Sequence, residues 1–387
     1  MFNAIKQQSN ETFDVVWDLG RRCTFACSYC GPHHSNKWSP NASFEILKHT
    51  LDGIVEYGEQ LNACRTERIP TCLAFTGGEP TVNPSFFDFI KYAKERYPDV
   101  ETNVTTNGFY SERKAQLIID NLGSTTISWH AEATDVEKKL VHDNIEMMRN
   151  QDYNFRINVM FHKDYFDEAA SLCDWLDEID ARYTPRIIGD SDSEEDVKDG
   201  TAHVYSSEQM KWLKDFYRRG NEAVNEESDS DKMASGNIGR PCCIRRPLAL
   251  KFDDEWRDGT FVPSNNFKGW NCMINWDFLF VNSELDKVWH HQTCQVNLDG
   301  KIGSIGTASG FDKINDKLRA QLSSGTIPTM KCPKTYCGCG TCSPKALHDA
   351  DFLEVWKERV TTVKPTIQVG IVEEGHEDSI YRMLKDD

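Results

Sequence analysis

The sequence has no long apolar run and few basic residues for its number of acidic ones. Nowhere do about 18 apolar residues follow one another, as a membrane-spanning helix requires. Residues 1–8 have no apolar stretch of the kind found in secretory leaders, so we expect no export by a recognisable signal. The 44 Lys and Arg stand against 61 Asp and Glu, a net charge of −17, and no basic run exceeds Arg245-Arg246. We therefore expect neither a nucleic acid nor a membrane as partner.

Cysteine, in contrast, is plentiful. The 387 residues include 14 cysteines, several of them at short spacings. Without a secretory leader, this clustering favours metal binding in a reducing compartment over disulfides, and we expect a cytoplasmic protein. The length and the hydrophobic content of 39% allow two domains, or one large barrel with an appendage.

Three cysteines, Cys23, Cys27 and Cys30, lie within eight residues, directly after the apolar run 13–19. Thiolates so close in sequence can hold three corners of a cubane iron–sulfur cluster, and the loop has no fourth cysteine for the last corner. One iron would then stay open to a small molecule that accepts an electron. A three-ligand zinc site and unrelated buried thiols are the alternatives, although zinc sites usually combine a close cysteine pair with a distant second pair.

Predicted strands and helices alternate through the first two hundred residues with short connections. This order favours parallel strands joined by helical crossovers, and about six units predict an α/β fold, a partial (β/α)6 TIM-like barrel. The predicted strands are 13–19, 71–75, 100–105, 125–129, 155–161 and 184–188.

Small and polar residues follow several of these strands. Gly77-Gly78-Glu79 follows the second strand, where two glycines let the backbone turn sharply and leave a carboxylate at the strand end. Ligands of such sheets bind beyond the carboxyl ends of the strands. The residues that this geometry collects with the three cysteines are Gly77, Gly78, Glu79, Asn107, His130, Glu132, Asn158 and His162.

The cysteine triplet with Tyr29 before its last member, followed by Gly77-Gly78-Glu79 after the next strand, resembles the radical S-adenosylmethionine (SAM) superfamily. The resemblance implies a 4Fe-4S cluster on Cys23, Cys27 and Cys30. Its open iron would bind SAM, and reductive cleavage of SAM would give a 5′-deoxyadenosyl radical that takes hydrogen from a substrate. The cofactor-binding candidates that it implies are Tyr29, Gly77, Gly78, Glu79, Asn107, Ser128, His130, Glu132 and Asn158.

Three of the last four candidates also have an ordinary structural interpretation. His130 would only hydrogen-bond a neighbouring loop, Glu132 would cap the next helix, and Asn158 would face the barrel interior. Within the superfamily, the roles implied for polar residues after the fourth and fifth strands are contacts to the ribose and carboxylate of SAM.

The amino-acid composition changes beyond residue 235, where aromatic and strand-forming residues predominate and no helix is expected before 310. Segments 270–281 and 290–302 predict hairpins, with Asp299-Gly300 as a turn. Cys332, Cys337, Cys339 and Cys342 lie within eleven residues. This cysteine-rich end resembles the SPASM or twitch extension, which implies one auxiliary 4Fe-4S cluster. A structural zinc knuckle is the competing interpretation. The implied ligands are Cys272, Cys294, Cys332 and Cys337, with Cys339 and Cys342 as alternatives; Cys242 and Cys243 have no assignment.

We therefore expect three parts: a radical SAM barrel (1–230), a small cysteine-rich β-hairpin domain with the auxiliary cluster (240–345), and a C-terminal helix with an acidic tail (346–387). The resemblance implies an enzyme that acts on a peptide or protein side chain, or on a small metabolite or sugar, with a flavodoxin or ferredoxin as electron donor. A non-catalytic iron–sulfur or zinc redox protein is the rival hypothesis. It explains the cysteines but not the glycine pair and its acid.

Overall fold

The computed structural model describes most of the barrel and parts of the C-terminal half. The described residues are 4–5, 12–30, 36–188, 204–226, 256–257, 260–261, 269–291, 303–332 and 345–366. Among them, no helix is long and apolar enough to cross a lipid bilayer.

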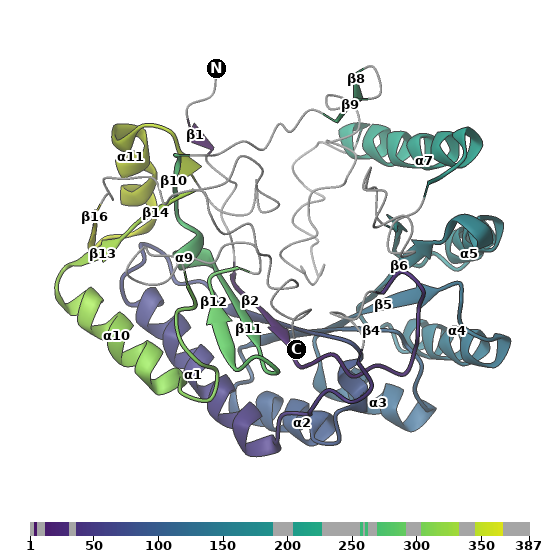
Figure 1. Cartoon of the computed structure of the whole chain (residues 1–387), viewed down its shortest axis with the longest axis horizontal. Coiled ribbons are helices and arrows are strands. Elements are labelled where there is room, and N and C mark those ends of the chain that lie inside the picture. The colour runs from purple at the N-terminus through teal and green to yellow at the C-terminus, as the bar shows by residue number, and fades with distance from the viewer. Residues whose placement is uncertain are drawn as a thin grey trace.

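A curved sheet forms the centre of the protein (Figure 1). Six neighbouring strands, β2 to β7, are all parallel and follow chain order. The predicted α/β fold with a partial TIM-like barrel is thereby confirmed. The six strands are β2 (Phe13–Asp18), β3 (Thr71–Thr76), β4 (Glu101–Thr106), β5 (Ser124–His130), β6 (Phe155–Phe161) and β7 (Tyr183–Ile187).

Helices cover the outer side of this sheet (Figure 1). Alternate strand residues such as Val15, Leu73 and Ile127 are buried against them, which leaves the intervening residues on the inner side. Local capping defines the helix starts: the Ser43 side chain accepts from the Ile46 N–H, and Thr134 forms a capping box with Glu137. The covering helices are α1 (Phe44–Asn62), α2 (Phe86–Arg96), α3 (Glu112–Asn121), α4 (Asp135–Asn150) and α5 (Phe166–Glu178), and α7 (Ser207–Glu226) follows β7.

A hairpin from the C-terminal half extends the sheet beside β2. Strand β11 (Phe278–Asn282) pairs with β2 in parallel, and β12 (Lys287–Trp289) pairs with β11 in antiparallel fashion. The hairpin expected within 270–281 is therefore shifted, and helix α9 (Ile274–Asp277) precedes it where no helix was expected. Residues 274–281 are all buried, and a continuously buried run lacks the periodicity that separates strand from helix.

The expected turn at Asp299-Gly300 lies outside the described residues. The three predicted domain boundaries stay a prediction. Strand β11 lies within the predicted segment 240–345 and yet belongs to the barrel sheet.

The C-terminal half is also tied to α1. Phe311 is the first residue of α10 (Phe311–Ser323) and packs directly against Gly53 of α1. A Cβ built on Gly53 would lie only 2.6 Å from the Phe311 Cβ, so α10 can approach α1 this closely only because residue 53 is glycine. Just beyond the C-terminal end of α1, buried Arg65 donates to the Trp276 carbonyl and lies 3.7 Å from the Asp277 carboxylate, which also accepts from Arg359 at 3.0 Å.

The remaining described elements are short, apart from one helix. The predicted C-terminal helix is present as α11 (Asp349–Arg359). A small sheet has the order β1-β15-β10-β14. The other strands are β1 (Ala4–Ile5), β8 (Trp256–Arg257), β9 (Thr260–Phe261), β10 (Asn271–Cys272), β13 (Thr326–Pro328), β14 (Met330–Lys331), β15 (Lys345–Ala346) and β16 (Lys364–Thr366).

Candidate active site at the carboxyl ends of the strands

The three N-terminal cysteines lie in the loop 20–30 after β2, here called the cysteine loop. All three are half-buried, and the Cys30 N–H donates to the Cys27 carbonyl at 3.1 Å. Burial is the main cause that raises the pKa of Cys27 to about 12 and of Cys30 to about 11, and the charge of a neighbouring thiolate adds to it. Thiolates that raise one another's pKa are stable together when a bound cation compensates them. The donor set therefore fits a bound cationic centre, and three thiolates can hold three irons of a 4Fe-4S cluster.

No three ligand-type side chains in the described part of the chain converge on a single metal ion. A four-iron cluster does not require this, because each cysteine binds a different iron.

The glycine pair lies directly against the cysteine loop. The Gly78 N–H donates to the Gly20 carbonyl at 2.7 Å, and the Glu79 N–H donates to the Arg22 carbonyl at 2.8 Å. A Cβ on Gly77 would lie 2.4 Å from the Gly20 oxygen, and Gly77 has a φ of +132°. A Cβ on Gly78 would lie 2.5 Å from the Arg22 oxygen. Both positions therefore require glycine, so that the two loops can meet.

The Glu79 side chain is buried and points into the protein. Its carboxylate accepts from the Thr81 N–H at 3.0 Å, the Thr81 hydroxyl at 2.7 Å, the Thr106 hydroxyl at 2.8 Å and the Asn107 N–H at 2.7 Å. Burial raises the pKa of Glu79, and these hydrogen bonds oppose the rise. The acid thus joins the glycine turn to the end of β4.

Asn107 connects the end of β4 to the cysteine loop. Its amide donates to the Thr24 hydroxyl at 2.8 Å, and Gly108 follows with a φ of +74°. The sequence placed Asn107 correctly at this edge but gave no signal for Thr24 as its partner.

His130 and Tyr29 lie beside Cys27. The His130 Nδ1 is 3.4 Å from the Cys27 sulfur and also contacts the Tyr29 hydroxyl, while the Phe25 ring meets His130 edge-on. Burial lowers the pKa of His130 to about 4, so its imidazole is neutral near pH 7. Two predicted cofactor residues thus lie within reach of a predicted cluster ligand.

Glu132 binds the backbone of the cysteine loop rather than capping the next helix. Its carboxylate accepts from the Ser28 N–H at 2.8 Å and lies 3.8 Å from His162 Nε2, which is itself 3.5 Å from the Ser28 hydroxyl. The cysteine loop is thereby held between its second and third cysteines.

Ser128 and Asn158 lie in register on β5 and β6, on the inner side of the sheet together with His130. Asn158 is buried, and its Oδ1 accepts from Arg186 Nε at 3.1 Å. Neither Ser128 nor Asn158 has a hydrogen bond to the cysteine loop among the described contacts. Sequence reasoning missed Arg186. Its place as a charged residue within the predicted strand 184–188 was a usable signal, because charged side chains inside a strand usually have a partner.

Of the predicted auxiliary ligands, Cys272 and Cys332 lie in the described part of the chain. Cys332 extends the pairing of β10 with β14: its N–H donates to the Trp270 carbonyl at 2.9 Å. Residues 270 and 272 share one face of the sheet, and Cys332 lies opposite Trp270. Cys272 and Cys332 are therefore diagonal neighbours on that face, and such neighbours are typically about 7–8 Å apart. Cys294, Cys337, Cys339 and Cys342 lie outside the described residues, as do Cys242 and Cys243.

The comparison with known families gives one match that includes this site. Residues 17–162 match the Radical SAM superfamily, a span that contains the cysteine loop, the glycine pair and Glu132, and that ends before the cysteine-rich C-terminal half.

Curated relatives match parts of the chain. A GTP 3′,8-cyclase of Nautilia profundicola is 30% identical over 106 residues, which are 26% of this chain and 29% of the relative. A GTP 3′,8-cyclase of Campylobacter fetus is 29% identical over 175 residues, 41% of this chain and 49% of the relative. The matched stretches thus span less than half of these relatives. Among solved structures, SuiB of Streptococcus suis has a TM-score of 0.48 at 14% identity, covering 81% of this chain and 68% of that one.

Proposed function

We propose that the protein is a radical SAM enzyme, which cleaves SAM reductively with a 4Fe-4S cluster on Cys23, Cys27 and Cys30, because its residues 17–162 match the Radical SAM superfamily. The observation that carries the proposal is the contact between the cysteine loop and the glycine pair, in which Gly78 N–H donates to the Gly20 carbonyl at 2.7 Å. A zinc or electron-transfer protein would need the cysteines alone.

When bound, the cluster would pass one electron from an external donor to SAM, whose cleavage would give methionine and a 5′-deoxyadenosyl radical that takes hydrogen from the substrate. The protein residues position the cofactor and keep water out. We assign the contact with the SAM amino group to backbone acceptors of Gly77 and Gly78. The Glu79 carboxylate, which already accepts four hydrogen bonds, holds that turn in place.

Ser128 and Asn158 are assigned to the ribose and carboxylate of SAM. Since the Asn158 Oδ1 accepts from Arg186, its Nδ2 is left as a donor for the ligand side. Tyr29 and His130, which contact each other beside Cys27, are assigned to the wall of the same site, with Asn107 and Glu132 holding the loop.

We propose a peptide or protein side chain as substrate, on the resemblance of the C-terminal cysteines to the SPASM or twitch extension. One auxiliary cluster, an electron donor such as a flavodoxin or ferredoxin, and a cytoplasmic location belong to this proposal. The activity named for the curated relatives favours a second candidate, in which the substrate is a small metabolite such as a nucleotide.

Anaerobic reconstitution with iron and sulfide, followed by SAM and dithionite, tests the activity. We expect 5′-deoxyadenosine from the wild type, none from Cys27→Ala, and normal formation from Cys64→Ala, a buried cysteine at the end of α1 outside the site. A filled cluster that yields no 5′-deoxyadenosine in the wild type would favour the redox protein instead.

Deuterium transfer distinguishes the two substrate classes. Extract from cells grown in heavy water should pass deuterium into 5′-deoxyadenosine when it contains the substrate. Protease treatment of the extract would abolish this transfer for a peptide or protein substrate and leave it intact for a small metabolite.

A further inference from the structure

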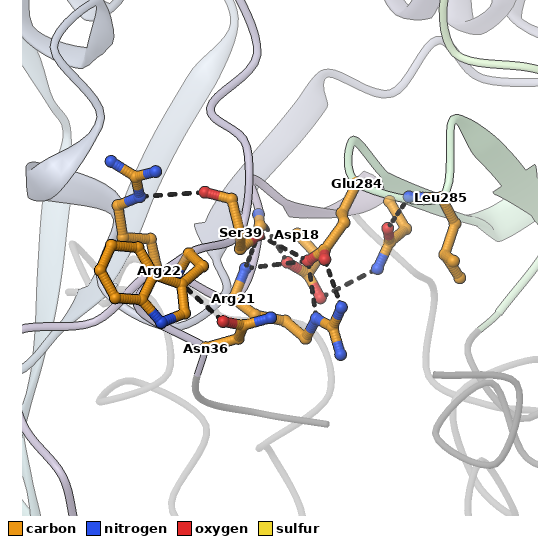
Figure 2. Close-up of polar contacts among 10 residues, drawn as sticks. Asp18, Arg21, Arg22, Asn36, Ser39, Glu284 and Leu285 are labelled. Carbon is orange, nitrogen blue, oxygen red and sulfur yellow. Dashed lines mark hydrogen bonds and ion pairs between the residues drawn. The ribbon is translucent and has the colours of Figure 1, made fainter. Parts of the chain in front are cut away.

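The turn of the β11–β12 hairpin, residues 283–286, lies against the start of the cysteine loop (Figure 2). Glu284 in this turn forms an ion pair with Arg21, contacting its Nη2 and accepting from its Nε at 2.8 Å and its backbone N–H at 3.2 Å. The Glu284 side chain is 8% exposed and that of Arg21 13%. A fork-shaped, charge-assisted contact of this kind fixes both direction and distance.

Glu284 also binds the segment that leaves the cysteine loop. The Ser39 hydroxyl donates to Glu284 at 2.8 Å and accepts from the Arg21 N–H at 3.2 Å, and Ser39 is 1% exposed. The Asn36 N–H donates to the Arg21 carbonyl at 2.8 Å. One carboxylate therefore joins the residues on both sides of the three cysteines.

A second set of contacts holds the same turn to the end of β2. Asp18 accepts from the Gly20 N–H at 2.9 Å and from the Asn282 amide at 3.1 Å, and the Ser283 N–H donates to the Asp18 carbonyl at 2.9 Å. Since the Gly20 carbonyl in turn accepts from Gly78, the hairpin turn, the cysteine loop and the glycine pair form one connected network.

The charges in this network favour an ionised Glu284. Burial alone would raise its pKa, but hydrogen bonds from Arg21 and Ser39 and the Arg21 charge outweigh burial, and the pKa of Glu284 lies below its ordinary value. Removing one partner of such a buried pair leaves the other charge uncompensated, which is costly.

We propose that Glu284 is a positioning residue for the SAM cluster: through Arg21 and Ser39 it holds the cysteine loop in the conformation in which Cys23, Cys27 and Cys30 bind iron. This positioning role depends on the proposed function in one respect, that the three cysteines bind a SAM cluster. Glu284 lies between Cys272 and Cys294 in sequence, so the hairpin would also connect the two proposed cluster sites.

The experiment compares Glu284→Gln, Arg21→Gln and the double variant with Asp286→Asn. Asp286 is the matched control, because it lies in the same turn but accepts from Ser309, at 2.7 Å from both its N–H and its hydroxyl, and not from the cysteine loop. Each reconstituted protein is exposed anaerobically to an iron chelator. The SAM cluster is followed through the change that added SAM causes in its electron paramagnetic resonance spectrum.

We expect the SAM-responsive signal to disappear at least about tenfold faster in Glu284→Gln than in the wild type. This factor corresponds to the free energy of one charge-assisted hydrogen bond. Arg21→Gln and the double variant should match it, because the two residues act through one contact. Asp286→Asn should behave as wild type.

Equal rates in Glu284→Gln and Asp286→Asn would overturn the proposal, and so would a lower unfolding temperature of Glu284→Gln with normal iron retention in the folded protein. Additive effects of the two single variants would overturn the route through Arg21. A wild type that binds no SAM-responsive cluster would refute the proposed function as well, whereas a stable, SAM-responsive cluster in Glu284→Gln refutes the positioning role alone.

Discussion

Replacing Gly78 by alanine tests whether the glycine pair and the cysteine loop depend on each other. The new Cβ would lie 2.5 Å from the Arg22 oxygen and 2.6 Å from the Arg21 oxygen, both backbone atoms that no rotamer change can move away. Forced overpacking costs about 1–3 kcal/mol. If the loops separate, the hydrogen bonds from Gly78 and Glu79 also break, at about 1 kcal/mol each. We expect about 3–5 kcal/mol in total.

Where this cost appears depends on which part of the protein moves. If the loops separate locally, the SAM site is disrupted while the barrel stays folded, and 3 kcal/mol corresponds to a loss of SAM affinity of about a hundredfold or more. Isothermal titration of SAM to the reconstituted protein and denaturant unfolding measure the two parts. Gly325→Ala is the control: its φ of +76° strains an alanine, but no atom lies within 4 Å of the new Cβ.

The control should lose about 1 kcal/mol of stability from backbone strain and keep its SAM affinity. A Gly78→Ala protein that unfolds and binds SAM like the wild type would refute the close approach of the two loops, and with it the central contact of the proposed site.

Three further outcomes follow from the same contacts. Glu79→Ala leaves four buried donors without their acceptor and should lower the free energy of unfolding, measured with denaturant, by at least about 3 kcal/mol. Glu79→Gln keeps an acceptor oxygen and should lower it clearly less, and equal losses in the two variants would contradict the role of the carboxylate. Burial raises the pKa of Asp18 to about 6, so the stability that this residue contributes is full below pH 4 and is lost as pH rises through 6. Relative to Asp18→Asn, the free energy of unfolding of the wild type should fall by about 3 kcal/mol between pH 4 and 7, and parallel pH profiles of the two proteins would contradict this. Cys332→Ala should reduce iron from about eight to about four atoms per chain and keep the SAM-responsive signal; unchanged iron, or zinc in the wild type, would refute the auxiliary cluster.

The C-terminal half contributes to the barrel more than its position in the sequence indicates. Its hairpin supplies a seventh parallel strand beside β2, and its turn binds the cysteine loop through Arg21. Apolar side chains of the hairpin, Phe278, Phe280 and Trp289, form a buried cluster against which Cys272 packs.

The sequence by itself determined the order of strands and helices, the three cysteines and the glycine pair. These features depend on residues close together in the chain: buried strands alternate with amphipathic helices, caps lie within one turn, and the metal-binding spacing is confined to eight residues. Even the edge of the sheet at which Asn107, His130 and Glu132 lie followed from the rule that ligand sites lie at the carboxyl ends of parallel strands.

Only the tertiary structure decided which side chains hold the cysteine loop. Glu284 looks in the sequence like any acidic turn residue, and its partner Arg21 lies 263 residues earlier. The Glu79 carboxylate, whose position was predicted, proved to be filled by the protein's own donors. Such contacts are set by how the packed strands bring loop ends together, and a pairing between distant residues leaves no periodicity in a single sequence.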